Sequence, residues 1–190
     1  VTGHDHQEAR AAFFEYAMWR DDFTAKGDEL ISKCAEKQEY DLLFHIILSR
    51  PYRKDCTSNG LALYNLLWGM SMAQRDALWT VKISTPSRHG EQLMDLARWA
   101  CEASASTLAA VDEQSAKACL ETLVWTLSST WRELRDRATH GIVHILVQHK
   151  GLIFPLLKTY SLVNDPYIEE RLWCAVYGAL LLLQDDVCTR

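Results

Sequence analysis

The sequence predicts an all-α protein whose helices pair and stack as an α-solenoid, and three observations support this fold class. Apolar residues recur with a period near 3.6 in almost every segment, as they do along one face of a helix. Only 4 prolines and 8 glycines occur in 190 residues, so long stretches are free of helix breakers. A shift of 34 residues matches large, charged and small positions in the second half of the chain, as a repeated helix pair would.

The composition fits one folded domain. Hydrophobic residues make up 48% of the chain and charged residues 24%, which are ordinary values for a globular protein. We expect residues 1–190 to form a single helical-repeat domain, with a weak internal boundary at the loop 84–90. Because the chain begins with Val1, we also expect it to be part of a larger protein.

Apolar stripes predict the helices of the first half. They fall at 13–19, 30–34, 42–47, 61–72 and 76–83. The third of these should end near Arg50, because Pro51 follows and a residue before proline disfavours the helical conformation. Trp79, Val81 and Ile83 alternate as in a strand. They are too isolated to pair with a second strand, so we expect a helix that runs into a loop.

Longer stripes follow the loop 84–90. They fall at 91–100, 118–127, 134–146, 152–157 and 168–183. Asp165 is expected to cap the last helix, since its carboxylate can accept hydrogen bonds from the N–H groups of the first turn. Pro166 suits the first helical position, where its missing N–H does no harm.

The 34-residue shift relates two of these helices. It places Leu134, Arg137, Gly141, Ile142 and Leu146 on Ile168, Arg171, Ala175, Val176 and Leu180. Arg137 and Arg171 occupy matching places. We therefore expect both to be structural, each tying the start of its helix to a neighbouring turn or carboxylate.

Arg75, Asp76 and Trp79 are predicted to form a packing motif. Arg75 and Trp79 are four residues apart and therefore share a helix face. We expect Trp79 to be buried with the Arg75 guanidinium stacked on it, and the two charged residues to fix a helix start.

The six cysteines form no metal or redox motif. They stand at 34, 56, 101, 119, 174 and 188, and no two make a CxxC pair. Cys34, Cys101, Cys119 and Cys174 have apolar or small neighbours, so we expect reduced, buried thiols in a cytoplasmic protein. No apolar run approaches the ~18 residues of a membrane helix, so no membrane contact is expected.

No catalytic residue, cofactor site or metal site is expected. The glycines do not form GxxxxGK[ST], whose backbone N–H groups wrap nucleotide phosphates, and no serine stands in GxSxG. His140 and His144 have the i, i+4 spacing of metal ligands, but Gly141 stands where HExxH has its glutamate. We interpret them as surface or half-buried histidines, with a metal site as the alternative.

Trp131, Arg132 and Arg135 are the candidate partner-binding residues. Trp131 follows a serine-rich turn, where an aromatic side chain can anchor a partner. The two arginines could contact phosphate or an acidic partner. Glu133 and Asp136 interleave with them, so an internally salt-bridged stretch is the favoured interpretation and a binding role the alternative.

Three segments resemble a known family. They are QRDALWT at 74–80, LSSTWRELRDRAT at 127–139 and NDPYIEERLWCAVYGA at 164–179. The Asp-Pro of the third, followed by an aliphatic residue and an arginine, is similar to a HEAT-repeat turn. Together the segments resemble the helical-repeat region of the bacterial antiviral STAND NTPases, the AVAST-type defence proteins, over about two-thirds of the chain from Leu61 onward.

This resemblance implies irregular HEAT-like helix pairs and a sensor role without enzyme activity in this region. Such a sensor recognises a phage protein and triggers assembly of the NTPase, whose other domains belong to the parent chain. The net charge of -5 agrees with a protein partner, since nucleic-acid-binding proteins usually carry a basic face.

Two alternatives remain. One is a DNA-repair glycosylase on a HEAT-like scaffold, which requires a concave basic groove with tryptophan and aspartate at its centre. The other is a plain helical scaffold or adaptor. A strongly positive groove would favour the glycosylase, and patches of mixed charge would favour the sensor.

Overall fold

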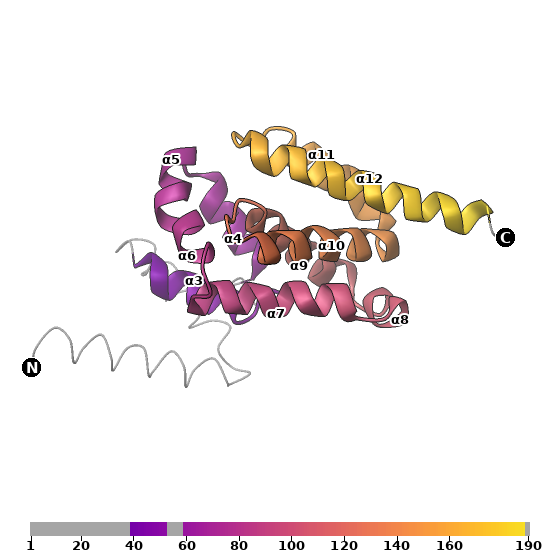
Figure 1. Ribbon diagram of the computed structural model, residues 1–190, viewed down its shortest axis with the longest axis horizontal. Helices are drawn as coiled ribbons and strands as arrows, with labels where there is room; N and C mark the ends of the chain where they lie inside the picture. Colours follow the sequence, from indigo (N-terminus) through magenta and orange to yellow (C-terminus); the bar gives the residue numbers. More distant parts are fainter. Residues whose placement is uncertain (1–38, 53–58, 189–190) are drawn as a thin grey trace, which may run out of the picture.

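The computed structural model describes residues 39–52 and 59–188, with side chains as far as Gln184. Every regular element within these two ranges is helical, which confirms the all-α prediction for the described part of the chain (Figure 1). The helices expected at 13–19 and 30–34 lie outside the described residues.

The elements follow one another in a simple order. They are α3 Tyr40–Leu48, α4 Gly60–Trp68, α5 Met72–Arg75, a π-helical turn Asp76–Thr80, α6 Val81–Ile83, α7 Arg88–Glu102, α8 Ala105–Ala109, α9 Glu113–Thr126, α10 Arg132–Gln148, a 3-10 turn Lys150–Leu152, α11 Ile153–Tyr160 and α12 Pro166–Cys188.

Helix α10 lies at the centre of the described part. It packs against α7 and against α12, and α9 packs against both α10 and α4. Figure 1 shows α12 along the top of the molecule, α9 and α10 in the middle and α7 below them. Helices α7 and α12 therefore lie on opposite sides of the middle layer.

The hydrophobic core runs through these layers as one cluster, from Leu43 in α3 to Ala179 in α12. Residues 84–87 form the loop between α6 and α7, where the sequence suggested a weak boundary. The Ser129 hydroxyl, in the turn after α9, donates a 2.8 Å hydrogen bond to the carbonyl oxygen of Ile83 just before this loop. Buried contacts therefore join the two sides of the loop.

Two helix pairs approach so closely that only glycine fits between them. A Cβ atom at Gly60 would lie 1.9 Å from the carbonyl oxygen of Ala118 in α9. A Cβ atom at Gly141 would lie 2.8 Å from the Cβ of Ala100 in α7. Both distances are shorter than real Cβ contacts, so glycine at these positions lets α4 reach α9 and lets α10 reach α7.

The segment 72–83 is one helical run rather than a strand. Ser71 caps it, and the Gln74 side chain completes a capping box. Trp79 and Ile83 are fully buried, whereas Val81 between them is 66% exposed. The alternation in the sequence therefore comes from two core positions four residues apart on one helix face.

The last helix begins as the sequence predicts. Helix α12 starts at Pro166, and the Asp165 carboxylate accepts a 3.3 Å hydrogen bond from the N–H of Ile168.

Most residue pairs that the 34-residue shift relates are buried to a similar extent, but the last pair is not. Leu146 is fully buried in α10, but Leu180 is 44% exposed, because it lies on the outward side of α12, whereas its neighbour Ala179 is fully buried.

The cysteines differ from one another in environment. Cys119 is buried, and this burial raises the pKa of its thiol to about 12. Cys101 is half-buried, while Cys174 is exposed, so the expectation of a buried thiol was wrong for Cys174. It points away from the core because the buried face of α12 is formed by other positions of the turn. Cys34 lies outside the described residues. Among the described helices, none is long and apolar enough to span a membrane.

Candidate functional site

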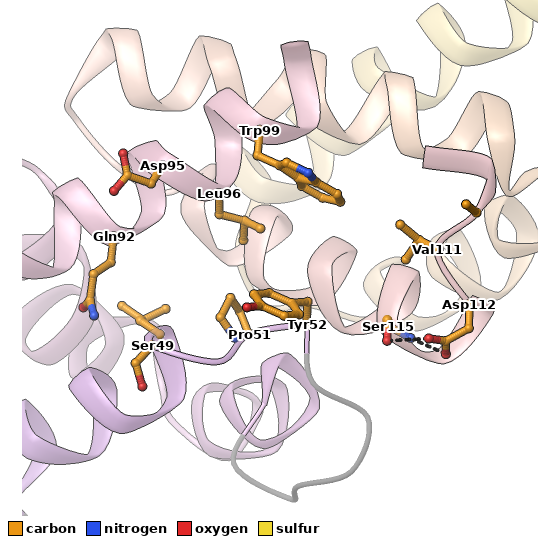
Figure 2. A pocket seen from close by; sticks show the side chains of 12 residues that line it. Ser49, Pro51, Tyr52, Gln92, Asp95, Leu96, Trp99, Val111, Asp112 and Ser115 are labelled. Carbon is orange, nitrogen blue, oxygen red and sulfur yellow. Dashed lines mark hydrogen bonds between the residues drawn. The ribbon is translucent and has the colours of Figure 1, made fainter. Parts of the chain in front are cut away.

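An open cleft of about 730 Å³ lies between the end of α3, helix α7 and the turn before α9. We call it the α3–α7 cleft, and Figure 2 shows its lining side chains. It is lined by Leu48, Ser49, Pro51, Tyr52, Gln92, Asp95, Leu96, Trp99, Ala110, Val111, Asp112 and Ser115.

One wall of the cleft is a single face of α7. Gln92, Asp95, Leu96 and Trp99 have the spacing i, i+3, i+4 and i+7, so they point to the same side of the helix. Leu96 is buried at the base of this wall, and Trp99 is 37% exposed. The Asp95 carboxylate accepts a 3.1 Å hydrogen bond from the exposed Arg98 guanidinium.

The opposite walls come from two turns. Tyr52, which follows α3 and Pro51, is 54% exposed. Asp112 is the N-cap of α9, and its carboxylate accepts hydrogen bonds from the backbone N–H and the hydroxyl of Ser115. In Figure 2 the two carboxylates lie toward opposite ends of the cleft, with Trp99 and Tyr52 between them.

The cleft has an acidic character. Two carboxylates line it, and no lysine, arginine or histidine does so among the residues that the structure describes. The Gln92 amide nitrogen lies 3.3 Å from Nδ1 of His45. The Gln92 amide oxygen is buried and has no hydrogen-bond partner in the described part of the chain.

A second surface feature is the outward face of α12. Its buried face consists of Ile168, Leu172, Ala175, Val176 and Ala179. On the other side Trp173, Tyr177, Leu180 and Leu181 follow one another at i, i+4, i+7 and i+8, and we call them the α12 stripe. They are 51%, 65%, 44% and 43% exposed, respectively.

The predicted partner-binding residues lie apart from both features. Trp131 is half-buried and packs against the core, with its ring near Gly90, so it is not the exposed anchor that the sequence suggested. Arg132 is exposed and pairs with Asp136 at 3.3 Å. Arg135 donates a 3.1 Å hydrogen bond to the carbonyl oxygen of Ser129.

Arginines join the starts of α10 and α12. The guanidinium groups of Arg135 and Arg171 lie 5.5 and 5.6 Å from the centre of the Tyr167 ring, within reach of a cation–π interaction. Arg171 also donates a 3.2 Å hydrogen bond to Asp136 of α10. Arg135 and Arg171 thus hold two helices together.

Arg137 makes the corresponding contacts with α7. Its guanidinium lies 3.3 Å from Glu133 of its own helix and 3.7 Å from Glu102 of α7. Like Arg171, it contacts a carboxylate on a neighbouring helix, as the sequence predicted.

Arg75 is the most enclosed cation with described contacts. It is 3% exposed and donates hydrogen bonds to the Met70 carbonyl oxygen and to Asn164. Its guanidinium lies 3.9 Å from the Asp165 carboxylate and 5.2 Å from the centre of the Trp125 ring. Arg75, the last residue of α5, therefore fastens this short helix to the turn before α12.

Trp79 is fully buried, as predicted, but its surroundings differ from the expectation. Its indole N–H donates a 3.0 Å hydrogen bond to the carbonyl oxygen of Trp125. The arginine stacks on Trp125 and not on Trp79. Asp76 is exposed and accepts a hydrogen bond from Thr80 inside the π-helical turn, so the helix start is fixed by Ser71 instead.

A carboxyl group of α9 is buried among the core side chains. Glu121 of α9 is 2% exposed and accepts a 2.6 Å hydrogen bond from the hydroxyl of Tyr160, which is fully buried. Burial raises the pKa of Glu121, while the Tyr160 hydrogen bond and the charge of Lys117 lower it by less. The pair belongs to the core and has no connection to the cleft.

His140 is exposed and His144 half-buried on α10. No group of three or more metal-ligating side chains occurs in the described ranges 39–52 and 59–188.

Sequence reasoning missed both surface features. The α12 stripe has a readable signal, because a second set of apolar residues at helical spacing remains after the buried set is assigned. The cleft has none, because its walls come from three segments whose contact is set by tertiary packing.

Comparison of the chain with protein-family models, with curated proteins and with solved structures found no match.

Proposed function

We propose that this chain is a protein-binding helical module that holds its partner on the α12 stripe. The exposed stripe carries the proposal. Single apolar residues are common on protein surfaces, but Trp173 and Tyr177 stand one turn apart and continue into Leu180 and Leu181. Adjacent exposed aromatic and leucine side chains mark a surface that another protein covers.

The proposed occupant is an amphipathic helix with Lys or Arg beside its apolar face. Helix α12 already packs its other face on α10, so its exposed face can accept one more helix by the same interdigitation of ridges. From Leu172 to Cys188 the sequence of α12 contains no basic residue. Glu169 and Glu170 precede the stripe, and Asp185 and Asp186 follow it in the sequence. A helix with basic ends complements this arrangement.

The test uses a labelled peptide of about 20 residues, which is long enough to span ~30 Å as a helix. One version carries Leu at i, i+3, i+4 and i+7 with Lys at both ends, and a second version carries Glu at the ends. Fluorescence anisotropy with the full chain should give an affinity at least about tenfold higher for the Lys version, which corresponds to ~1.4 kcal/mol. Equal affinities would contradict the proposed occupant.

The matched variants locate the surface. Trp173→Gln with Tyr177→Gln should remove binding, because exposed aromatic anchors dominate interface energies. Phe154→Gln with Leu162→Gln serves as the control, because these side chains are 74% and 77% exposed but lie outside the stripe. Loss of binding in the control pair alone, or self-association of the chain through α12 in sedimentation, would reject the proposal.

We also propose the sensor role, on the strength of the three motifs quoted above. In this proposal the helices form an irregular HEAT-like α-solenoid, the parent protein is an antiviral STAND NTPase and the partner is a phage protein in the cytoplasm. A protein captured from phage-infected lysate by the wild type and the control pair, but not by the stripe variant or from uninfected lysate, would support it. Tight, salt-sensitive DNA binding without a protein partner would reject it and favour the glycosylase.

The surface chemistry favours the protein partner over the glycosylase. A glycosylase groove must attract phosphates with lysine and arginine. The α3–α7 cleft instead carries two carboxylates. Of the arginines at the starts of α10 and α12, Arg132 and Arg171 pair with Asp136, and Arg137 pairs with Glu133.

A further inference from the structure

We propose that the α3–α7 cleft binds a basic peptide segment and takes one arginine or lysine side chain beside the rings of Trp99 and Tyr52. The cleft is lined by α7 and neighbouring turns, whereas the stripe belongs to α12, and these two helices lie on opposite sides of the middle layer (Figure 1). The inference is therefore independent of the proposed function.

The two aromatic rings supply the first part of the recognition. Trp99 and Tyr52 are large side chains that remain 37% and 54% exposed, and both line the same cleft from different walls (Figure 2). The face of an indole or phenol ring attracts a cation, and tryptophan does so most strongly. A guanidinium or ammonium group entering this opening meets aromatic surface on both sides.

The charge of the cleft supplies the second part. Asp95 contributes a negative charge from the α7 wall, and the described lining contains no cation. Arg98 contacts Asp95, but both side chains are well exposed, at 47% and 73%. Such a surface pair is screened by water and weakly bound, so a ligand cation can share or replace it.

The shape of the cleft favours a side chain with its backbone over a bare ion. A volume of about 730 Å³ lies within the range of ~300–1,000 Å³ that holds drug-sized ligands. Leu96 and Pro51 offer apolar surface for the methylene stem of arginine or lysine. The unpartnered amide oxygen of Gln92 can accept a hydrogen bond from a ligand N–H after a rotation of the amide.

The experiment measures binding of acetyl-Ala-Arg-Ala-amide to the full chain by NMR, following the backbone N–H resonances of the residues that line the cleft. The matched probe replaces arginine by citrulline, which has nearly the same shape but no charge. We expect the arginine peptide to bind at least about tenfold more tightly than the citrulline peptide. A lysine peptide in parallel distinguishes guanidinium from ammonium, and either cation binding above the neutral probe supports the proposal.

Two variants with matched controls assign the effect to the cleft. Asp95→Asn and Trp99→Leu should each weaken arginine-peptide binding about three- to tenfold. Glu170→Gln and Trp173→Leu remove an exposed acid and an exposed tryptophan from α12 and should leave binding unchanged. Asp95→Asn removes an exposed charge and should fold normally, so it keeps the test valid if Trp99→Leu does not fold.

Three results would overturn the proposal. They are equal binding of the arginine and citrulline peptides, binding unaffected by Asp95→Asn, and equal weakening by the α12 controls. If butylguanidinium binds as tightly as the arginine peptide, the peptide backbone contributes nothing, and a peptide segment is rejected as the ligand.

Discussion

The side chain of Glu121 places a carboxyl group in an apolar environment, where it has one described hydrogen bond. It lies among the core side chains of α9 with Tyr160 as its donor. An acid in this setting favours its neutral form, because burial penalises charge more than the tyrosine hydroxyl and the charge of Lys117 relieve it. The free energy of unfolding should therefore depend on whether Glu121 is protonated.

The pH dependence has a definite sign. Because the pKa of Glu121 is raised in the folded state above its ordinary value of 4.5, this group stabilises the fold below that value. Its contribution is lost as the pH rises through the raised pKa. The free energy of unfolding of Glu121→Gln, relative to wild type, should therefore increase between pH 4 and pH 7.

Urea denaturation at several pH values measures this difference. Glu170→Gln is the control, because Glu170 is exposed and its removal should shift stability by the same small amount at every pH. A difference between Glu121→Gln and wild type that stays constant with pH would contradict the assignment.

At this scale the sequence was informative about local neighbours only. The burial of Trp79 followed from its apolar spacing, and the capping role of Asp165 followed from its position before a proline. The partner of Arg75 did not follow. Sequence spacing relates residues on one helix, whereas Trp125 reaches Arg75 through the packing of separate elements.

At the scale of elements, close approach between helices distinguishes this structure from a loosely packed bundle. Gly60 begins α4 against the backbone of α9, and the neighbouring atom is a carbonyl oxygen that cannot rotate away. A side chain at this point must push the two helices apart, which costs packing along their whole contact.

Gly60→Ala is therefore expected to lower the free energy of unfolding by about 1–3 kcal/mol, the usual cost of overpacking. Gly151→Ala is the matched control, because nothing lies within 4 Å of a Cβ at that position, and its effect should stay within about 0.5 kcal/mol. Chemical denaturation of both variants measures the two changes. Equal changes in the two variants would show that α4 can move away from α9 without a loss of stability.

The sequence predicted long elements better than short ones. Helices α7, α9, α10 and α12 each carry several turns of apolar spacing, and all four lie close to the predicted stripes. Helix α8 was missed, because Ala105–Ala109 is only five residues long and buries Leu108 alone. No period can be recognised over a single turn.

At the scale of the whole molecule, the described residues share one hydrophobic core. The cluster extends from α3 to α12 without a break at the loop 84–87. Core residues on the two sides of the loop belong to the same cluster, so unfolding of one side exposes apolar surface of the other.

We therefore expect the described region to unfold in one cooperative step. Far-UV circular dichroism and tryptophan fluorescence should give coincident urea transitions, since tryptophans lie on both sides of the loop at Trp79 and Trp125. Two separated transitions would show that the loop 84–87 divides the chain into independent folding units.

The contacts of Arg75 also have a consequence for how the chain is made. Its hydrogen-bond partner Asn164 lies 89 residues further along the sequence. At ribosomal speeds of ~5–20 residues per second, this interval corresponds to roughly 4–18 s of synthesis. During that time the guanidinium has only the Met70 carbonyl oxygen among its described hydrogen-bond acceptors. Helix α5 is fastened by Arg75 only after the turn before α12 has been made. A nascent chain stopped before residue 164 therefore lacks two of the hydrogen bonds that satisfy this buried guanidinium.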